Sequence, residues 1–246
     1  MNADQSLRIA VAFAREAAKS PEARLCSACV DVLDVTGAGI TIMGGGGGGH
    51  AGPICVSNPR MAALEDLQYA IGEGPCQDAF KSNMFVHAPR LDVAAATLWP
   101  SFVDLAHSTG VGAVFAYPLS ANGAKIGVLT LYQDDAGELS ATQHEDSIAM
   151  VEVLTETVLS LQDAAPVGTL AADLDDVVAY RAEIHQASGM VSVQLQLPVA
   201  EALLRIRAYA FADGRPLGVV AREIVTRRLR LADDRVDLPR DPKEGE

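Results

Sequence analysis

Cysteines are the first residues of this 246-residue sequence with chemistry to consider. Cys26 and Cys29, in "CSAC", could form a redox pair or half of a metal site, but no second close pair accompanies them. On a helix, two thiols three residues apart lie on one face, as core residues also do. Together with Cys55 and Cys76, these cysteines are too few and too scattered for a disulfide scaffold. In a reducing compartment they are most simply small buried hydrophobic residues.

Cys76 is the candidate residue for binding a small-molecule ligand. It follows Pro75, which suits the first turn of a helix, and a helix N-terminus favours the thiolate form of a cysteine. A packed, inert cysteine is the alternative interpretation.

The sequence carries none of the common enzymatic or metal-binding motifs. The five histidines show no HxxxH or HExxH spacing, and the sequence contains no nucleophile elbow or Walker motif. Six glycines at 44–49 are followed by neither Lys-Ser nor Lys-Thr, so a hairpin tip is favoured over a phosphate-binding loop. We therefore expect no metal, no cofactor and no enzymatic activity.

Arginines are concentrated near the C-terminus. Between Val177 and Leu231 eight arginines accompany four acids, a local charge of +4 in a chain whose net charge is −13. All four lysines lie outside this segment. Arginine has a planar fork that suits phosphate and a flat face that stacks on bases. The chain as a whole is too acidic to coat nucleic acid or anionic lipid, but this segment predicts a local basic patch.

The elements that position these residues alternate between helix and strand over the first 160 residues. Apolar periodicity and capping residues predict helices over residues 9–18, from 21 through "EARLCSACVDVL", over "MAALEDLQYAI", from Pro75, and over "WPSFVDLAHSTG". Strands are predicted at "GAGITIM", "PICVS" and "MFVHA". Two further β-rich runs meet at Asn122 and Gly123, a pair typical of a tight hairpin. This mixture predicts an α+β domain.

A long helix follows the hairpin. Its apolar residues recur at spacings of three and four and predict one stripe, formed by Ile148, Val151, Leu154, Val158 and Leu161. Such a stripe suits packing on the sheet or on a partner helix.

The C-terminal segment carries no strand pattern and predicts three helices. The predicted buried positions are Val177, Tyr180, Ile184, Ala187, Val191 and Leu195 on the first helix, Val199, Leu203, Ile206 and Ala210 on the second, and Leu217, Val220, Ala221 and Ile224 on the third. Gly189 lies inside the first helix, where glycine costs about 1 kcal/mol relative to alanine. Either a neighbouring helix or a flipped nucleobase could occupy the space beside it.

The phrases "IGEGPCQDAF", "WPSF", "AYPL" and "GVLTLY" resemble the signature of a GAF domain over residues 5–162. GAF domains are small-molecule or redox sensing modules with a pocket on one face of an antiparallel sheet flanked by helices. The resemblance implies a sensory unit with a small-molecule ligand and does not name that ligand.

The segment 174–231 resembles an ANTAR domain, the RNA-binding module of transcription antitermination regulators. The family pattern is matched by Arg181, Ile184, Ala187, Gly189, Met190 and Val191 on the first helix, Ala202, Arg207 and Ala210 on the second, and Val220, Ala221, Ile224 and Val225 on the third. ANTAR proteins grip paired stem-loops in nascent RNA and so prevent a terminator hairpin from forming. The resemblance implies an all-α three-helix domain with RNA as its partner.

One residue departs from the ANTAR pattern. Ser188 replaces a lysine between the alanine and the glycine, which removes a cationic arm and predicts weaker RNA binding, with a changed or a lapsed RNA target as the alternatives. The predicted RNA-binding residues are Arg181, Ala187, Ser188, Gly189, Arg205, Arg207 and Tyr209.

The predicted organisation is a GAF sensory domain at 1–163, a linker at 164–173, an ANTAR domain at 174–231 and an acidic, disordered tail at 232–246. No apolar run is long enough to span a membrane and the N-terminus does not read as a signal peptide, so a cytoplasmic protein is expected. The apolar helices predict a homodimer presenting two RNA-binding modules to tandem stem-loops. The alternatives are a DNA-binding regulator and a protein-interaction module without nucleic acid.

Overall fold

The structure of this chain is a computed structural model that describes residues 3–17, 25–43, 50–107, 109–164, 175–213, 215 and 217–231. Contacts divide the chain into two compact units, Met1–Arg181 and Ala182–Glu246, and each is described by itself. This division falls within helix α8, Asp175–Leu195. Apart from Ala164, the predicted linker at 164–173 lies outside the described residues, as do the glycine run at 44–49 and the tail at 232–246.

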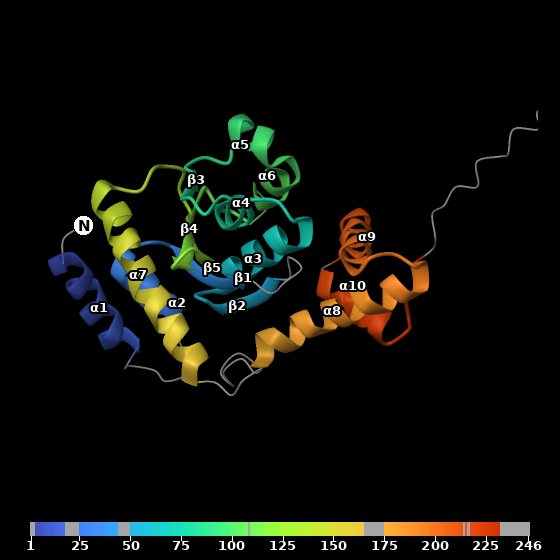
Figure 1. Ribbon diagram of the computed structural model, residues 1–246. Helices are drawn as coiled ribbons and strands as arrows, with labels where there is room; N and C mark the ends of the chain where they lie inside the picture. The colour runs from blue at the N-terminus through green and yellow to red at the C-terminus, as the bar shows by residue number, and fades with distance from the viewer. Residues whose placement is uncertain are drawn as a thin grey trace, which may run out of the picture. The chain divides into compact units, whose positions relative to one another are not determined.

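The N-terminal unit is built on a five-stranded antiparallel sheet in the order β2-β1-β5-β4-β3 (Figure 1). The strands are β1 Gly37–Met43, β2 His50–Val56, β3 Val86–Ala88, β4 Ala113–Ala121 and β5 Ala124–Gln133. β4 and β5 form the predicted hairpin, and both Asn122 and Gly123 have the positive φ that such a tight turn requires. The predicted strands are confirmed, although "MFVHA" is strand only from Val86.

Three helices cover one face of the sheet: α1 Ala3–Ala17, α2 Leu25–Leu33 and α7 Ala141–Ala164 (Figure 1). The predicted stripe on α7 is right at Leu154 and Val158, which are buried, but Ile148 is 40% exposed. Because α7 packs against both α1 and β4, its buried face also includes Ala149 and Met150.

Four helices lie on the other face: α3 Pro59–Ile71, α4 Pro75–Ser82, α5 Val93–Leu98 and α6 Pro100–His107. Helix α5 was not predicted. Its run of alanines has no apolar period, but the side chain of Asp92 caps it by accepting hydrogen bonds from the backbone N–H groups of Ala94 and Ala95. The sheet and its two helical layers confirm the predicted α+β architecture of this unit.

In the C-terminal unit, α8 is followed by α9, Val199–Ala212, and α10, Leu217–Val225. Nearly all the predicted core positions whose side chains are described are covered, with Ile184, Ala187, Val191 and Leu195 of α8 buried. Val199 is the exception at 52% exposed, because it is the first residue of α9 and Ala202 takes the buried position instead. The side chains of Val177 and Tyr180 lie outside the described ones.

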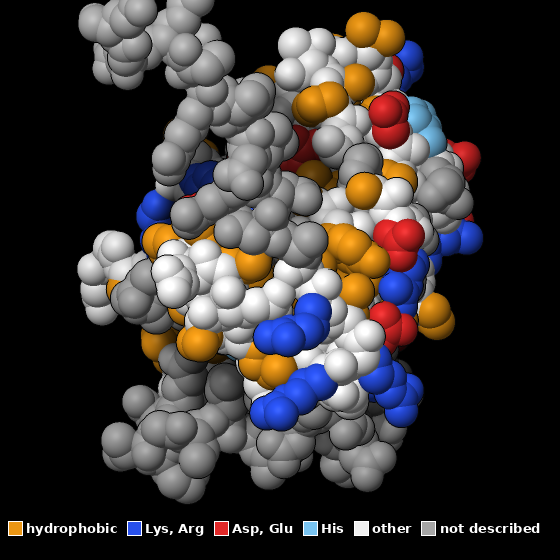
Figure 2. Space-filling view, turned by 90° about the vertical axis from the view of Figure 1, so that its right-hand side faces the viewer, with side chains coloured by type: hydrophobic (Ala, Val, Ile, Leu, Met, Phe, Trp, Pro, Cys, Tyr) orange, Lys and Arg blue, Asp and Glu red, His pale blue; other side chains and the backbone are white. Residues whose placement is uncertain are grey.

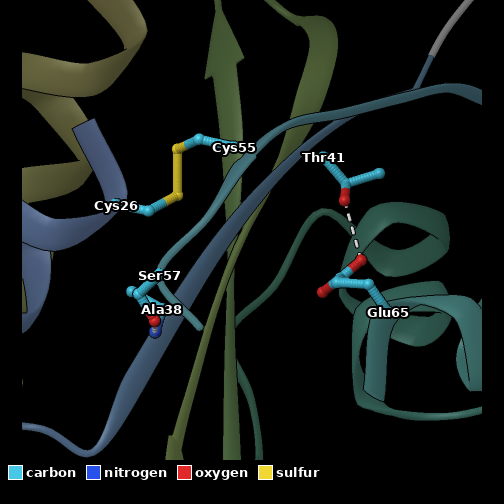
Figure 3. The surroundings of a disulfide bond; sticks show 6 residues. All are labelled: Cys26, Ala38, Thr41, Cys55, Ser57 and Glu65. Carbon is cyan, nitrogen blue, oxygen red and sulfur yellow. Dashed lines mark hydrogen bonds between the residues drawn. A yellow bond between two sulfur atoms is a disulfide. The ribbon is translucent and has the colours of Figure 1, made fainter. Parts of the chain in front are cut away.

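The cysteines correct one prediction. Cys26 of α2 and Cys55 of β2 form a disulfide with their Cα atoms 5.8 Å apart (Figure 3). They were expected to be unpaired core residues, because they are 29 positions apart and only the fold brings helix α2 beside strand β2. Cys29 and Cys76 are buried and take no part in the disulfide, and their burial was predicted.

Candidate functional site

A cluster of buried polar side chains lies between the sheet and helices α3 and α4. Glu65 and Gln68 come from α3, Thr41 from β1, Thr130 from β5 and Cys76 from the first turn of α4. Each of them is at most 2% exposed. Buried polar groups are costly unless they are hydrogen-bonded, so a concentration of them marks a place where the protein makes specific polar contacts.

Glu65 is the charged member of this cluster. The Thr41 hydroxyl donates a 2.7 Å hydrogen bond to the Glu65 carboxylate across the face of the sheet (Figure 3). The Cys76 thiol lies 4.0 Å from the same carboxylate oxygen. Cys76 is therefore a packed residue beside a carboxylate, and its assignment to a ligand stays a prediction.

Gln68 ties helix α3 to the start of α4. Its Oε1 atom accepts a 2.8 Å hydrogen bond from the backbone N–H of Cys76. Gly74 precedes this turn with a φ of 125°, and a side chain there would approach Gln68 Oε1 to 2.7 Å. Glycine at this position thus serves both the backbone conformation and the close approach of Gln68.

Gln68 Nε2 and Thr130 Oγ1, both in this cluster, have no hydrogen-bond partner among the described residues. Both side chains are completely buried. Such groups are rare in folded proteins, because an unmade hydrogen bond costs about 1–3 kcal/mol. An amide donor and a hydroxyl beside a buried carboxylate could together hold a small polar ligand.

The residues of the "IGEGPCQDAF" and "WPSF" phrases contact one another. Trp99 donates a 2.8 Å hydrogen bond from its indole Nε1 to Asp78, and the Glu73 side chain accepts a 2.8 Å bond from the backbone N–H of Phe102. These bonds connect α4 and the loop before it to α6. These two hydrogen-bonded phrases therefore form one connected segment beside the polar cluster, which we call the frame.

An open groove of about 720 Å³ lies next to this frame. It is lined by Asp78, Lys81, Ser82, Phe85, Val86, His87, Leu98 and Trp99. The groove runs along edge strand β3 and was not predicted, although all its lining residues fall between Asp78 and Trp99.

The second candidate site is the arginine-bearing surface of the C-terminal unit. Two of its arginines are held by carboxylates: Arg222 pairs with Glu183 at 3.2 Å, and Arg215 contacts both Asp213 and Glu223. The hydrogen bond to Glu223 raises the pKa of the Arg215 guanidinium. These two arginines fix helices and loops of this unit to one another.

Four other arginines form no ion pair with any described residue: Arg205, Arg227, Arg228 and Arg230. Arg227, Arg228 and Arg230 follow helix α10 and are exposed, while Arg205 on α9 is partly exposed. Figure 2 shows basic side chains lying beside hydrophobic ones on one face of the molecule. Such a mixture offers both phosphate contacts and stacking.

The predicted RNA-binding residues are not all placed alike. Ala187 and Ser188 are completely buried, and Ser188 donates a 2.8 Å hydrogen bond to the Ile184 carbonyl one turn earlier. Gly189 is partly exposed, and a Cβ atom there would meet nothing within 4 Å. Of the three, only Gly189 thus lies beside open space, and no neighbouring helix of the described chain fills it.

The other predicted residues lie on helix α9, except Arg181, whose side chain lies outside the described ones. Arg205 and Tyr209 are one turn apart and therefore share a face of the helix. Arg207 is partly exposed, but its Nε and Nη2 atoms are covered. Arg205 and Tyr209 are consequently the better placed pair for a phosphate and a base.

Comparisons with known proteins were made at the level of sequence and of structure. No protein-family model and no curated protein matches the chain. The chain is similar to the GAF domain of a phosphoenolpyruvate-protein phosphotransferase from Coxiella burnetii, at 15% identity over 67% of this chain and 98% of that one, with a TM-score of 0.49. The corresponding Acinetobacter domain has 13% identity over 68% and 99%, with a TM-score of 0.48.

A type II free methionine-R-sulfoxide reductase from Thermoplasma acidophilum is also similar, at 16% identity over 62% of this chain and 93% of that one, with a TM-score of 0.31. Likeness of this size to GAF domains and to an enzyme supplies no activity for this chain. The α+β architecture therefore rests on the sheet topology itself.

The described residues include neither a membrane-spanning helix nor a metal-binding cluster. None of their helices has the length and apolar character needed to cross a membrane. Among these residues no group of three or more His, Cys, Asp or Glu side chains is arranged to hold a metal ion.

Proposed function

We propose that this chain is a signal-responsive RNA-binding regulator that promotes transcription antitermination. Its N-terminal unit is a GAF-type sensor, and its C-terminal unit is an ANTAR-type module that binds tandem stem-loops in nascent RNA. The observation that carries the proposal is the set of arginines on the C-terminal unit that no described carboxylate neutralises, led by Arg205 beside Tyr209. A regulator of this kind acts in the cytoplasm and needs no catalytic activity of its own.

The buried polar cluster supports the sensory part of the proposal. Glu65, Gln68 and Thr130 offer a carboxylate, an amide donor and a hydroxyl within a water-excluded part of the fold. Ligand sites are typically apolar with a few such convergent polar groups. A small polar molecule that satisfies Gln68 Nε2 and Thr130 Oγ1 would be stabilised there and would stabilise the unit in turn.

Exposed apolar residues support a homodimer. Leu7 and Val11 of α1 are 64% and 51% exposed, and Ile148 and Leu159 of α7 are 40% and 37% exposed. Because α1 packs against α7, these side chains belong to neighbouring helices of one layer. A dimer would bring two RNA-binding modules to two stem-loops, with the gain in affinity that tethering provides. Light scattering that finds only a monomer at working concentration would contradict this part of the proposal.

The proposal is tested by the binding of the full chain to labelled tandem RNA stem-loops, with unlabelled duplex DNA as competitor. We expect the RNA complex to survive a large excess of duplex and to weaken steeply as salt rises, because arginine–phosphate contacts release counterions. Preferential displacement by duplex would instead identify a DNA-binding regulator. No binding of either nucleic acid at low salt would identify a protein-interaction module.

A further inference from the structure

The Cys26–Cys55 disulfide fastens an edge strand of the sheet to a helix. β2 is the outermost strand beside β1, and Cys55 lies near its C-terminal end. Cys26 is the second residue of α2 and is 1% exposed, whereas Cys55 is partly exposed. The bond is thus more accessible from the side of Cys55 than from the side of Cys26.

The strand that the disulfide fastens is otherwise irregularly paired. The register between β1 and β2 shifts between Ile40 and Thr41 and again between Ile42 and Met43. Pro53 also lies within β2 and has no N–H group to donate to the ladder. Just beyond the end of β2, the Ser57 N–H donates a 2.9 Å hydrogen bond to the Ala38 carbonyl. The Ala38 N–H in turn donates a 2.9 Å hydrogen bond to the Ser57 hydroxyl oxygen. The disulfide therefore fastens the regularly paired C-terminal end of β2, next to the stretch where the register shifts.

Strand β1 connects the disulfide to the buried polar cluster. Ile40 pairs with Cys55 on one side, and the next residue, Thr41, points to the opposite face and donates its hydrogen bond to Glu65 (Figure 3). Helix α3, which carries Glu65, also packs against both β1 and β2. A change in the attachment of β2 is therefore felt directly at the Thr41–Glu65 contact.

The remaining thiol of helix α2 does not compete with this pair. Cys29 lies one turn beyond Cys26 and is completely buried, and burial raises the pKa of its thiol to about 12. The Cys29 thiol therefore stays protonated at neutral pH. Because only a thiolate attacks a disulfide, Cys29 does not displace either partner of the bond. Cys26, the other cysteine of α2, is paired with Cys55 and becomes the leaving group when a thiolate attacks the more exposed Cys55.

Disulfides are uncommon in reducing cytoplasm, and those that form there are mostly transient and serve catalysis or redox sensing. This inference rests on the proposed function, because a protein that acts on nascent RNA works in that compartment. We propose that Cys26 and Cys55 are a reversible thiol–disulfide exchange site, at which a hydroperoxide and a dithiol reductant set the attachment of β2 and thereby the state of the sensory unit.

The two half-reactions balance without a metal or cofactor. In oxidation, a hydroperoxide converts the Cys55 thiol to a sulfenic acid and releases water or an alcohol; the Cys26 thiolate then attacks that sulfur, and the oxygen leaves as water. In reduction, one thiolate of the dithiol attacks Cys55 and displaces Cys26 as a thiolate that takes up a proton. The second thiol of the reductant then attacks the mixed disulfide, releasing Cys55 and leaving the reductant oxidised.

The test uses the full chain after treatment with hydrogen peroxide or with dithiothreitol, followed by denaturing alkylation and mass spectrometry. We expect two fewer labels in the oxidised form, because two of the four cysteines are paired. Amide hydrogen exchange in β2 should be about tenfold faster after reduction, since local opening of the strand becomes easier. The C55S variant should show the fast exchange under both treatments, and the matched C29A variant should respond like the unaltered chain.

Two results would overturn the inference. One is a disulfide that resists dithiothreitol in the native protein, which would make it a permanent structural bond. The other is exchange in β2 that is the same in both redox states. Neither measurement involves RNA, so loss of RNA binding in both redox states would contradict the proposed function and leave the exchange site standing.

Discussion

Inside the N-terminal unit, Thr41, Glu65, Gln68 and Thr130 are polar side chains enclosed between a sheet and its helices. Among the described residues of the C-terminal unit, the buried side chains are aliphatic apart from Ser188, and four arginines without a described ion pair lie at or near the surface. A small ligand can form hydrogen bonds with enclosed polar groups, whereas a polyanion binds to cations that are exposed at the surface. The contrast therefore separates a unit suited to sensing from a unit suited to binding a large partner.

The largest expected effect concerns a glycine of the sheet. Gly127 lies in β5, and a Cβ atom there would collide with the carbonyl oxygen of Thr41 in the adjacent strand. We expect G127A to destabilise the N-terminal unit by about 3 kcal/mol, because the strands carrying the polar cluster must separate. Urea unfolding followed by fluorescence measures this loss, since the single tryptophan, Trp99, belongs to that unit. Wild-type stability in G127A would show that the sheet tolerates the added methyl group.

Two threonines on the same face of the sheet, Thr41 and Thr130, differ in whether the hydroxyl group has a hydrogen-bond partner among the described residues. T41V removes the donor to the buried Glu65 carboxylate and should cost about 2 kcal/mol in the same unfolding measurement. T130V removes a buried hydroxyl that has no partner among the described residues, so it should instead stabilise the unit by about 1–2 kcal/mol. Equal losses in the two variants would contradict the separate roles assigned to these threonines.

The smallest effect is expected at the helical glycine of the C-terminal unit. Because a Cβ atom at Gly189 meets nothing within 4 Å, G189A should stabilise helix α8 by about 1 kcal/mol through helix propensity alone. Hydrogen exchange of the α8 amides reports this gain. If a nucleobase packs on the backbone there, the same variant should also bind stem-loops less tightly. If G189A stabilises helix α8 but leaves the affinity for RNA unchanged, Gly189 does not belong to the proposed interface.

Much of the fold could be predicted from local patterns. Strand β1, the hairpin at Asn122 and Gly123, and the helix starting at Pro75 depend on short-range rules of burial, turn chemistry and capping. Helix α5 was missed because an alanine run has no apolar period, and Ile148 was misplaced because two neighbours, α1 and β4, share the buried face of α7.

The candidate sites were less predictable, because tertiary contacts decide them. Nothing in the spacing of Cys26 and Cys55 indicates a disulfide, and the approach of Thr41 to Glu65 needs the sheet to exist. The phrases "IGEGPCQDAF" and "WPSF" predicted a GAF-type unit, but not that their residues would contact one another beside the polar cluster. In the C-terminal unit, the apolar spacing predicted the burial of Ala187, but the family pattern did not reveal that Ser188 would be buried or that Arg215 and Arg222 would be bound by carboxylates.

The most direct test of the central claim measures the affinity of R205E for tandem RNA stem-loops as a function of salt. R90E is the matched control, because it makes the same charge change at an exposed arginine of the N-terminal unit. We predict that R205E binds at least about tenfold more weakly and that its salt slope falls by about one, because an arginine–phosphate contact is lost. R90E should bind like the unaltered chain. Equal affinities and slopes for R205E and R90E would contradict the claim that the C-terminal arginines hold RNA.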